Sequence, residues 1–336
     1  MTGRARHPVA LAVTLTLALV AGGRTAAGPS PAPAGAVGPV DAIRPVSFSA
    51  RVDVQWVDGR GRHATTVDVG AARGLVRVAG TGSPERPGAG APPTLGDGWL
   101  LVTPAGPGAP VGDLPPAVEA KYDIERTVGP VVAGRTTTLV VLSEGAMVRE
   151  KLAIDDELGL VLRRELFGPD GRPVRTVTVI ELDPSSPRLA GTPTTDDRAE
   201  PVAPDVLGAL YRTPGELAGG YRRVGAFRRG PVVHVLYSDG LHGLSLFMQP
   251  GRLDRHRQPP GGAAVRIGSA TGQRYTWAGG EIVTWESGPV VRTLVGDAAT
   301  AEVVSAARSV PPTGRPSLSE RLRSACRQMA EVLGAG

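Results

Sequence analysis

Residues 131–182 read VVAGRTTTLVVLSEGAMVREKLAIDDELGLVLRRELFGPDGRPVRTVTVIEL, a run of apolar and β-branched segments separated by turns. β-branched residues suit a pleated, half-buried surface, and residues 136–142 are rich in them. Turn signals follow at 155–159 (DDELG) and 168–171 (GPDG), where acids accept local backbone hydrogen bonds and glycine takes positive φ. Because no helix-length segment separates the strands, the stretch predicts an antiparallel meander.

Side-chain alternation indicates how these strands face the interior. Between residues 148 and 154 the even positions are mostly apolar (Val148, Leu152 and Ile154), whereas Arg149 and Lys151 are charged. This period of two is typical of a strand with one buried face and one solvated face. For the last strand of the stretch, the residues expected along one side are Val174, Thr176, Thr178, Ile180 and Leu182.

Upstream segments extend the predicted sheet. Residues 46–56 alternate without exception between apolar residues and polar or charged ones, and residues 118–124 alternate in the same way. We therefore expect strands at both places in a first domain of residues 45–183. A sheet this long has to curl, because its apolar face needs a partner and few helical segments are available to cover it.

The expected architecture of the first domain is an open antiparallel half-barrel with an apolar concave face. Such a face has room for an acyl chain or for a segment of another protein. The alternative is that the protein's own loops fill the concavity. The residues expected on the concave face are Trp56, Trp99, Tyr122, Leu160 and Phe167.

A second, smaller domain is expected at residues 206–311, after a linker at 184–205 that is rich in proline, threonine and acids. Its clearest sign is a hairpin in which two β-prone segments flank the turn Ser238-Asp239-Gly240. A second hairpin is expected within 274–285, followed by another strand and a helix at 298–308. The chain is therefore predicted to be mainly β, with an α+β second domain.

The C-terminal residues 312–336 have a signature of their own. Ser317 and Glu320 form a capping box, and apolar residues then recur on one helical face. We expect an amphipathic tail helix, which either docks on its own domain or offers its apolar stripe to a partner. The single cysteine of the chain, Cys326, lies in this segment, so no intramolecular disulfide is possible.

The N-terminal residues 1–27 have the features of an export signal. Arg4 and Arg6 precede an apolar run that is shorter than the roughly 20 residues needed to span a bilayer, and small residues follow. Residues 28–44 read as a disordered tether of proline, alanine and glycine. The predicted location is therefore periplasmic or extracytoplasmic, outside the cell membrane.

Charge and composition exclude one class of partner. The formal net charge of +5 falls to +2 when residues 1–27 are removed, because three arginines and no acid leave with them. So small a charge, spread over two domains, makes no basic stripe for nucleic acid. Lys121 and Lys151 are the only lysines, and the abundance of arginine, alanine, glycine and proline indicates a GC-rich bacterial genome.

No catalytic or metal-binding constellation stands out, so the sequence predicts no enzyme and no cofactor. Ser238, Asp239 and His242 are close in sequence, but Ser-Asp-Gly is ordinary hairpin chemistry, and triad members come from separated elements. No histidine pair has metal-site spacing with a third ligand. The arginines around 222–229 form either an ordinary solvated face or a site for an acidic partner or lipid head groups. The residues expected in partner docking are Arg222, Arg223, Arg228, Arg229, Tyr237 and Asp239.

Two separated stretches resemble one protein family. The first has AGR at 133–135, an acidic turn, LRRE at 162–165 and a DG hairpin, and the second is YRRVGAFRRGPVVHVLYSDGLHGLSLFMQ at 221–249. In this order they resemble the MucB/RseB regulators of sigma-E signalling, as an actinobacterial-type member. The N-terminal domain of that family shares the half-barrel of the LolA/LolB lipoprotein carriers. The matches cover roughly half of the chain, and residues 80–112 depart from the family's pattern.

The resemblance implies a regulatory function. It implies that the chain binds a membrane-anchored anti-sigma factor and protects it from proteolysis until a lipid or misplaced-lipoprotein signal releases it. The half-barrel would be the sensor and the second domain would dock the partner. The linker would transmit the effect of ligand binding from the half-barrel to the second domain. The alternative is a LolA-like carrier of lipid or lipoprotein with no role in transcription. The oligomeric state is left open.

Overall fold

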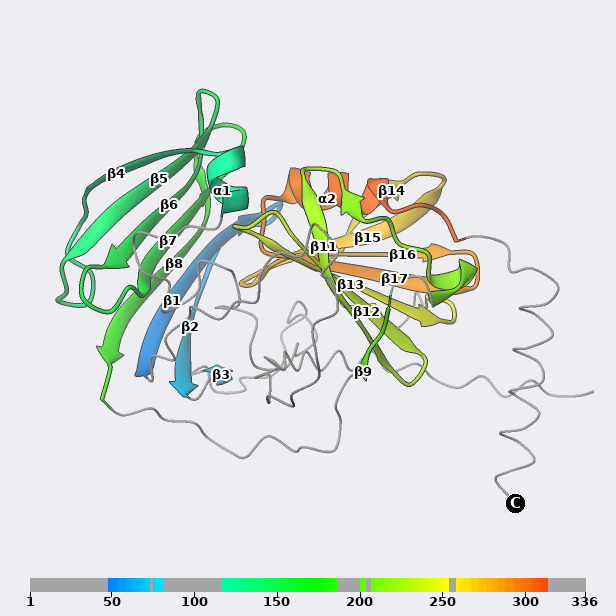
Figure 1. Ribbon diagram of the computed structural model, residues 1–336, viewed down its shortest axis with the longest axis horizontal. Helices are drawn as coiled ribbons and strands as arrows, with labels where there is room; N and C mark the ends of the chain where they lie inside the picture. The colour runs from blue at the N-terminus through cyan, green and yellow to red at the C-terminus, as the bar shows by residue number, and fades with distance from the viewer. Residues whose placement is uncertain are drawn as a thin grey trace, which may run out of the picture.

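The computed structural model describes residues 48–72, 75–80, 116–185, 200–203, 207–253 and 258–313. The expected signal segment and tether, Trp99, most of the linker and the tail helix with Cys326 lie outside these residues. The described chain forms two antiparallel sheets, a curled one on the left of Figure 1 and a second one that carries helix α2 (Thr300–Ser309). The predicted mainly-β fold with an open half-barrel is confirmed.

The half-barrel has eight strands in the order β3-β2-β1-β8-β7-β6-β5-β4. The strands are β1 (Phe48–Asp58), β2 (Gly61–Ala72), β3 (Leu75–Gly80), β4 (Asp123–Val128), β5 (Thr137–Glu144), β6 (Met147–Asp155), β7 (Val161–Phe167) and β8 (Pro173–Asp183). Neighbouring strands in the sheet are mostly neighbours in sequence, as in a meander. The exception is β1 with β8, where Ser49 lies opposite Asp183.

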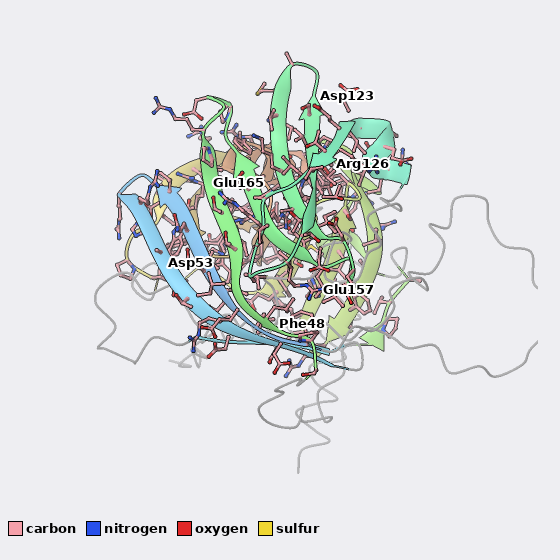
Figure 2. The ribbon with its side chains drawn as sticks, turned by 90° about the vertical axis from the view of Figure 1, so that its left-hand side faces the viewer. Phe48, Asp53, Asp123, Arg126, Glu157 and Glu165 are labelled. Carbon is pink, nitrogen blue, oxygen red and sulfur yellow. The ribbon has the colours of Figure 1, made fainter. Side chains whose placement is uncertain are left out.

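Alternation sets the inner face of the half-barrel. In β1, Phe48, Ala50, Val52 and Val54 are buried, as the sequence pattern predicts. The residues between them face outward, and Figure 2 looks onto this outer side, with the second sheet behind it. Polar side chains such as Asp53 occupy the outer side, so one face of the sheet is solvated and the other is packed.

Two sequence predictions for this sheet are wrong. Residues 118–124 form helix α1 (Pro116–Lys121) and the start of β4 rather than one strand. Their alternation also fits a helix, because Val118 and Tyr122 are four residues apart and both are buried. The even residues of β8 do not share one side either. A β-bulge opposite Arg51 leaves Ile180 exposed and turns Leu182 toward the inner cluster.

The second sheet follows the order β10-β11-β12-β13-β17-β16-β15-β14, and β9 pairs with β11. The strands are β9 (Glu200–Pro201), β10 (Glu216–Leu217), β11 (Tyr221–Arg229), β12 (Val232–Ser238), β13 (Gly243–Pro250), β14 (Ala263–Ile267), β15 (Ala270–Trp277), β16 (Gly280–Ser287) and β17 (Val290–Gly296). Both predicted hairpins and the helix after the last strand are present, so the α+β character of this part is confirmed.

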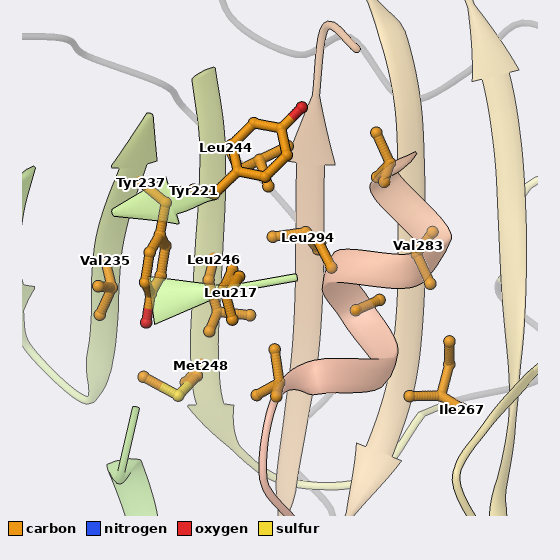
Figure 3. Close-up of a cluster of buried hydrophobic side chains, with 14 of the residues drawn as sticks. Leu217, Tyr221, Val235, Tyr237, Leu244, Leu246, Met248, Ile267, Val283 and Leu294 are labelled. Carbon is orange, nitrogen blue, oxygen red and sulfur yellow. The ribbon is translucent and has the colours of Figure 1, made fainter. Parts of the chain in front are cut away.

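Helix α2 packs its apolar side on the second sheet. Its residues Val303, Val304, Ala306 and Ala307 are buried. Figure 3 shows the helix over the sheet and the side chains of the strands beneath it, including Leu294. The fully buried residues of this core all come after 206, with Val202 packed against them, and the core is separate from the clusters of the half-barrel.

The AGR segment forms a tight turn that Asp155 stabilises. The first and last residues of turn 132–135 exchange backbone hydrogen bonds of 3.0 and 2.9 Å, with Ala133 and Gly134 at φ of 50° and 75°. The Arg135 guanidinium donates to both carboxylate oxygens of Asp155. One of those oxygens also accepts from the backbone N–H groups two and three residues downstream, at 3.0 and 2.6 Å. The buried carboxylate therefore joins two turns.

Replacing Asp155 by alanine is expected to lower the free energy of unfolding by about 2 kcal/mol, because two backbone N–H groups lose their acceptor and the half-buried Arg135 keeps only the exposed Glu157. Asp156→Ala is the matched control, since this neighbour is exposed and its side chain accepts a hydrogen bond from the Thr138 hydroxyl at 2.8 Å. The control is expected to stay within about 0.5 kcal/mol of the parent. Urea unfolding measures both, and equal losses would contradict the role of Asp155.

Candidate functional site: a charged cluster between the two sheets

A group of charged side chains joins the half-barrel to the second sheet. This inter-sheet cluster consists of Glu150 on β6, Arg164 on β7, Arg175 on β8, Asp239 and His242 in the β12–β13 turn, and Asp297 after β17. Glu150 is 0% exposed and His242 is 1% exposed. Charges buried to this extent require partners, because losing water around an unpaired ion costs several kcal/mol.

The three members on the half-barrel share its inner face with leucines. Glu150 lies opposite Leu166, and Leu166 lies opposite Arg175 on the next strand. Arg164 lies opposite Leu152 in the same way. Since directly opposed residues of antiparallel strands point to the same side, these charges interrupt an otherwise apolar surface.

The β12–β13 turn is fixed by its own hydrogen bonds. The Ser238 hydroxyl donates to the carbonyl oxygen of His242 at 3.0 Å and accepts from the N–H of Gly240 at 3.0 Å. Asp239 Oδ1 accepts from the N–H groups of Leu241 (3.0 Å) and His242 (2.7 Å). The turn is therefore held in one conformation, with Asp239, Leu241 and His242 buried.

The other carboxylate oxygen of Asp239 binds helix α1. Asp239 Oδ2 accepts from Lys121 Nζ at 2.5 Å and from the Tyr122 hydroxyl at 2.9 Å. Burial alone would raise the pKa of Asp239, but His242 and Lys121 hold it well below its usual range. The same carboxylate thus organises its own turn and anchors it to the half-barrel.

Glu150 lies at the centre of the cluster. Arg164 Nε donates to Glu150 Oε1, and Arg164 Nη1 donates to Asp297 Oδ2 at 2.9 Å. His242 Nε2 lies 3.2 Å from Glu150 Oε2, a charge contact without hydrogen-bond alignment. Burial opposes ionisation of Glu150, but the charges of Arg164 and His242 lower its pKa to about 2. The carboxylate is therefore ionised between two cations.

Asp297 completes the cluster from the segment between β17 and α2. Its Oδ1 accepts from the N–H of Gly243 at 2.9 Å, and its carbonyl oxygen accepts from Arg175. Burial and the neighbouring charge of Arg164 lower the pKa of Arg175 to about 10. A further ion pair, Arg149 on β6 with Glu302 on α2, lies beside the cluster. Ion pairs and hydrogen bonds from three half-barrel strands and α1 thus hold the second sheet in place.

The charge of His242 depends on these neighbours. Burial by itself would lower the pKa of His242, but the carboxylates of Glu150 and Asp239 raise it to about 9. Three carboxylates act on it: Glu150 on β6, Asp239 in its own turn and Asp297 after β17. Lys121 and Tyr122 bond to the same Asp239, and Arg164 pairs with Glu150 and Asp297. His242 is therefore charged at neutral pH in the folded protein.

We expect the free energy of unfolding to fall by on the order of 2 kcal/mol between about pH 6.5 and pH 9. An unfolded histidine titrates near 6.5, so the stabilisation by His242 is fully present below that pH. It is lost as the pH rises through the folded pKa of about 9. Urea unfolding at several pH values between these limits measures the slope.

His242→Gln is the control for this pH dependence, since it removes the titrating group and should flatten the slope. His234 contributes little in this window and with the opposite sign, because burial lowers its folded pKa to about 4 and only its unfolded form is still partly protonated just above pH 6.5. A parent protein whose stability is as flat as that of His242→Gln would show that His242 is neutral when folded.

The structure places the residues predicted for the concave face in different surroundings. Trp56 is half-buried and stacks on His63, with ring centroids 5.2 Å apart. Leu160 is buried in the inner cluster, and Tyr122 is buried too, although it extends from the end of α1. Phe167 lies on the outer face, where Lys151 Nζ is 5.3 Å from its ring. Trp99 is outside the described residues.

The residues predicted for partner docking do not form one surface. The arginines lie in two pairs at opposite ends of β11, 222–223 and 228–229. The outer member of each pair, Arg222 or Arg229, is exposed. Of the other two, Arg223 Nη1 donates to the carbonyl oxygen of Thr213 at 3.4 Å, and the Arg228 guanidinium lies 5.8 Å from the Tyr211 ring. Tyr237 is in the core, and its hydroxyl donates to the carbonyl oxygen of Pro214 at 3.0 Å. Asp239 is buried in the inter-sheet cluster.

Sequence reasoning missed Glu150, Arg164, Arg175, His242 and Asp297 as one group. A signal for the first was present, since Glu150 is the charged exception among the apolar even positions of its strand. Arg164 likewise stands between two buried leucines two residues to either side. Charged residues at inward positions indicate a buried partner, but the alternation pattern does not reveal which distant residue provides it.

The turn chemistry does not form a hydrolase triad. Ser238 Oγ bonds to the backbone of His242 and not to its ring. Among the described residues no three His, Cys, Asp or Glu side chains are grouped as metal ligands. In the same part of the chain, no helix has the length and apolar character required to cross a membrane.

Comparisons with known proteins give a structural similarity only. No protein-family model and no curated protein matches this chain significantly. The crystal structure of MucB in complex with MucA(peri) matches with a TM-score of 0.41 and 18% identity, over 82% of this chain and 97% of that one. The MucA/MucB complex of Pseudomonas aeruginosa gives 0.40 and 19%, over 82% and 96%. The crystal structure of MucB gives 0.44 and 17%, over 81% and 94%.

Proposed function

We propose that this protein is an exported, non-enzymatic regulator of extracytoplasmic sigma-factor signalling that binds a membrane-anchored anti-sigma factor. One observation carries the proposal: the two stretches that resemble the MucB/RseB family, 131–182 and 221–249, meet in space. Glu150 of the first stretch lies 3.2 Å from His242 of the second, and Asp239 in the same turn as His242 binds Lys121 of α1. Motifs far apart in the sequence therefore form one buried assembly.

This arrangement suits a regulator built of two cooperating parts. The half-barrel is the proposed sensor of a lipid or lipoprotein, and the second domain (residues 206–311) is the proposed dock for the anti-sigma factor. A ligand shifts such a system only if it binds the two states unequally, so the contacts between the parts have to differ between those states. Export rests on the N-terminal segment, and assignment as an actinobacterial-type member rests on the sequence resemblance.

Affinity capture tests the proposal directly. Residues 28–336 would serve as bait for detergent-solubilised membranes of the host, with proteins and lipids identified by mass spectrometry. A single-span membrane protein with a cytoplasmic sigma-binding region is the expected product. Its purified extracytoplasmic segment should then bind the bait in isothermal titration calorimetry. Recovery of acylated lipid or lipoprotein alone would instead indicate a LolA-like carrier.

Arg222→Glu is expected to weaken binding of that extracytoplasmic segment several-fold, by about 1 kcal/mol, because Arg222 is an exposed cation on β11. Arg172→Glu is the matched control: this arginine is 85% exposed on the β7–β8 hairpin of the half-barrel. The control should bind like the parent in the same titration. Equal weakening by both variants would indicate a general charge effect rather than docking at β11.

A further inference from the structure

The β12–β13 turn inserts a leucine into the half-barrel. Leu241 is 0% exposed, although it belongs to the second sheet's hairpin. It packs in a cluster formed by α1 and the strands β5 and β6: Val118, Tyr122, Val140, Leu142, Leu152 and Ile154. The inner face of the half-barrel at this end thus already holds an aliphatic group from the other part of the chain.

The turn also fits closely against helix α1. A Cβ atom placed on Gly240 would lie 2.9 Å from Val118 Cγ2, 3.1 Å from Ala117 Cβ and 3.2 Å from the Val118 nitrogen. The last of these is a backbone atom, which cannot move aside as a side chain does. Glycine is therefore required for the turn to sit on α1, and its φ of +96° adds to that requirement.

Polar contacts at the rim of the leucine site hold the turn in place. Lys121 and Tyr122 both bond to Asp239, so these bonds exist only while the turn is seated. If the turn left, Leu241 and its aliphatic site would both be exposed, and Glu150 would lose contact with His242. Opening therefore breaks ionic contacts and uncovers apolar surface at the same time.

We propose that the Ser238–His242 turn is a latch: an aliphatic ligand entering between α1 and strands β5 and β6 displaces Leu241. This frees the turn from α1 and from Glu150, and so weakens the attachment of the second sheet to the half-barrel. The inference rests on the proposed sensing role of the half-barrel. It assigns the coupling between the two parts to a packed turn instead of to the linker at 184–205. Leu241 and the ligand exclude each other because they occupy the same site.

The latch sets the apparent affinity for such a ligand. If a ligand binds only the unlatched state, its apparent affinity is its intrinsic affinity multiplied by the fraction of molecules in that state. A change that weakens the closed state should therefore strengthen ligand binding, even though it touches no ligand. This inverse relation separates a latch from an ordinary binding site, where disturbing the packing weakens binding.

Gly240→Ala in the full mature chain opens the latch by its clash with α1. Dansyl-labelled undecanoate serves as the aliphatic probe, with binding followed by its fluorescence. We expect the variant to bind at least about ten-fold more tightly than the parent. Gly220→Ala is the matched control, because Gly220 has a φ of +79° in another turn of the same sheet and a Cβ there meets nothing within 4 Å. The control should bind like the parent.

A second variant keeps the test decisive if Gly240→Ala does not fold. Lys121→Gln removes the ammonium that bonds to Asp239 and leaves the turn backbone and the leucine site unchanged. Because the closed latch then loses one ionic contact, the variant should bind the probe at least about five-fold more tightly than the parent. Lys151→Gln is its matched control, since this lysine lies over the Phe167 ring on the outer face and the variant loses the same charge. Equal binding by Lys121→Gln and Lys151→Gln would overturn the proposal.

The latch and the proposed function fail in different experiments. The probe measurements need no anti-sigma factor, so a failed membrane capture leaves them intact. Conversely, a captured anti-sigma factor together with no probe binding by Gly240→Ala or Lys121→Gln would overturn the latch and leave the regulator proposal standing. Hydrogen exchange of 238–243 adds a readout: exchange should accelerate in Gly240→Ala and not in Gly220→Ala if the turn is released.

Discussion

Replacing Glu150 by alanine is expected to lower the free energy of unfolding by about 3–5 kcal/mol, the usual effect of removing one partner from a buried ion pair. Its carboxylate is 0% exposed and is the partner of Arg164 and the neighbour of His242. Without it, the positive charge of Arg164 is left with Asp297 alone, and His242 loses the charge that most favours its protonation. The loss should appear in urea unfolding at pH 7.

Glu144→Ala controls for the loss of a glutamate from the same hairpin. The Glu144 side chain is 53% exposed and lies 3.5 Å from Arg149, so it is a surface pair. Such pairs contribute little, and a change within about 0.5 kcal/mol is expected. Glu150→Gln should fall between the two, because it keeps the shape but removes the charge. If Glu150→Ala cost no more than Glu144→Ala, the inter-sheet cluster would not stabilise the protein.

Gly280→Ala is expected to cost at least about 3 kcal/mol, since it combines backbone strain with a collision that cannot be relieved locally. Gly280 has a φ of +133°, and a Cβ there would lie 2.1 Å from the carbonyl oxygen of Gly296. It would also lie 2.8 Å from Arg175 Nη1 and 3.0 Å from Asp297 Cα. The substitution therefore pushes β16 away from β17 and disturbs the inter-sheet cluster.

Gly268→Ala separates the two causes of that loss. Gly268 has a φ of +58° in the hairpin between β14 and β15, and a Cβ there meets nothing within 4 Å. Only the cost of the left-handed conformation remains, about 1 kcal/mol. Thermal unfolding of the two variants side by side gives the comparison. If the Gly280→Ala protein were as stable as Gly268→Ala, the backbone around Gly296 would be able to move away from the added methyl group without a loss of stability.

The sequence predicts a strand well where its pattern fits only one kind of secondary structure. The strict alternation from Phe48 to Trp56 fits only a strand with one buried face, and this segment lies in β1. For Val118 to Tyr122 two rules compete, because residues four apart share a side in a strand and lie on one face of a helix. In the structure this segment is helical, and Val118 and Tyr122 pack in one cluster with Leu241. Leu241 is distant in the sequence, so the local pattern does not reveal this contact.

The inter-sheet cluster could be anticipated only in part. The charge at Glu150 breaks the apolar pattern of its strand, which indicates a buried partner. Arg164 lies in the next strand of the meander, so it could be predicted as the partner of Glu150. Its second partner, Asp297, lies at the end of β17 in the other sheet, and no local pattern in the sequence indicates that pairing. The side of Ile180 was unpredictable because one β-bulge reverses the alternation without leaving a signal in the residues themselves.

The strand order has a consequence for how the chain folds. Most pairs in both sheets join consecutive strands, so their loops are short and close quickly. Two pairs close long loops: β1 with β8, where Ser49 meets Asp183, and β13 with β17, where Leu244 meets Gly296. Closing a loop of that length costs chain entropy before any contact forms. We therefore expect these two pairs to limit the folding rate. Asp297 follows β17 directly, so we expect the two sheets to dock only after the second of these pairs has formed.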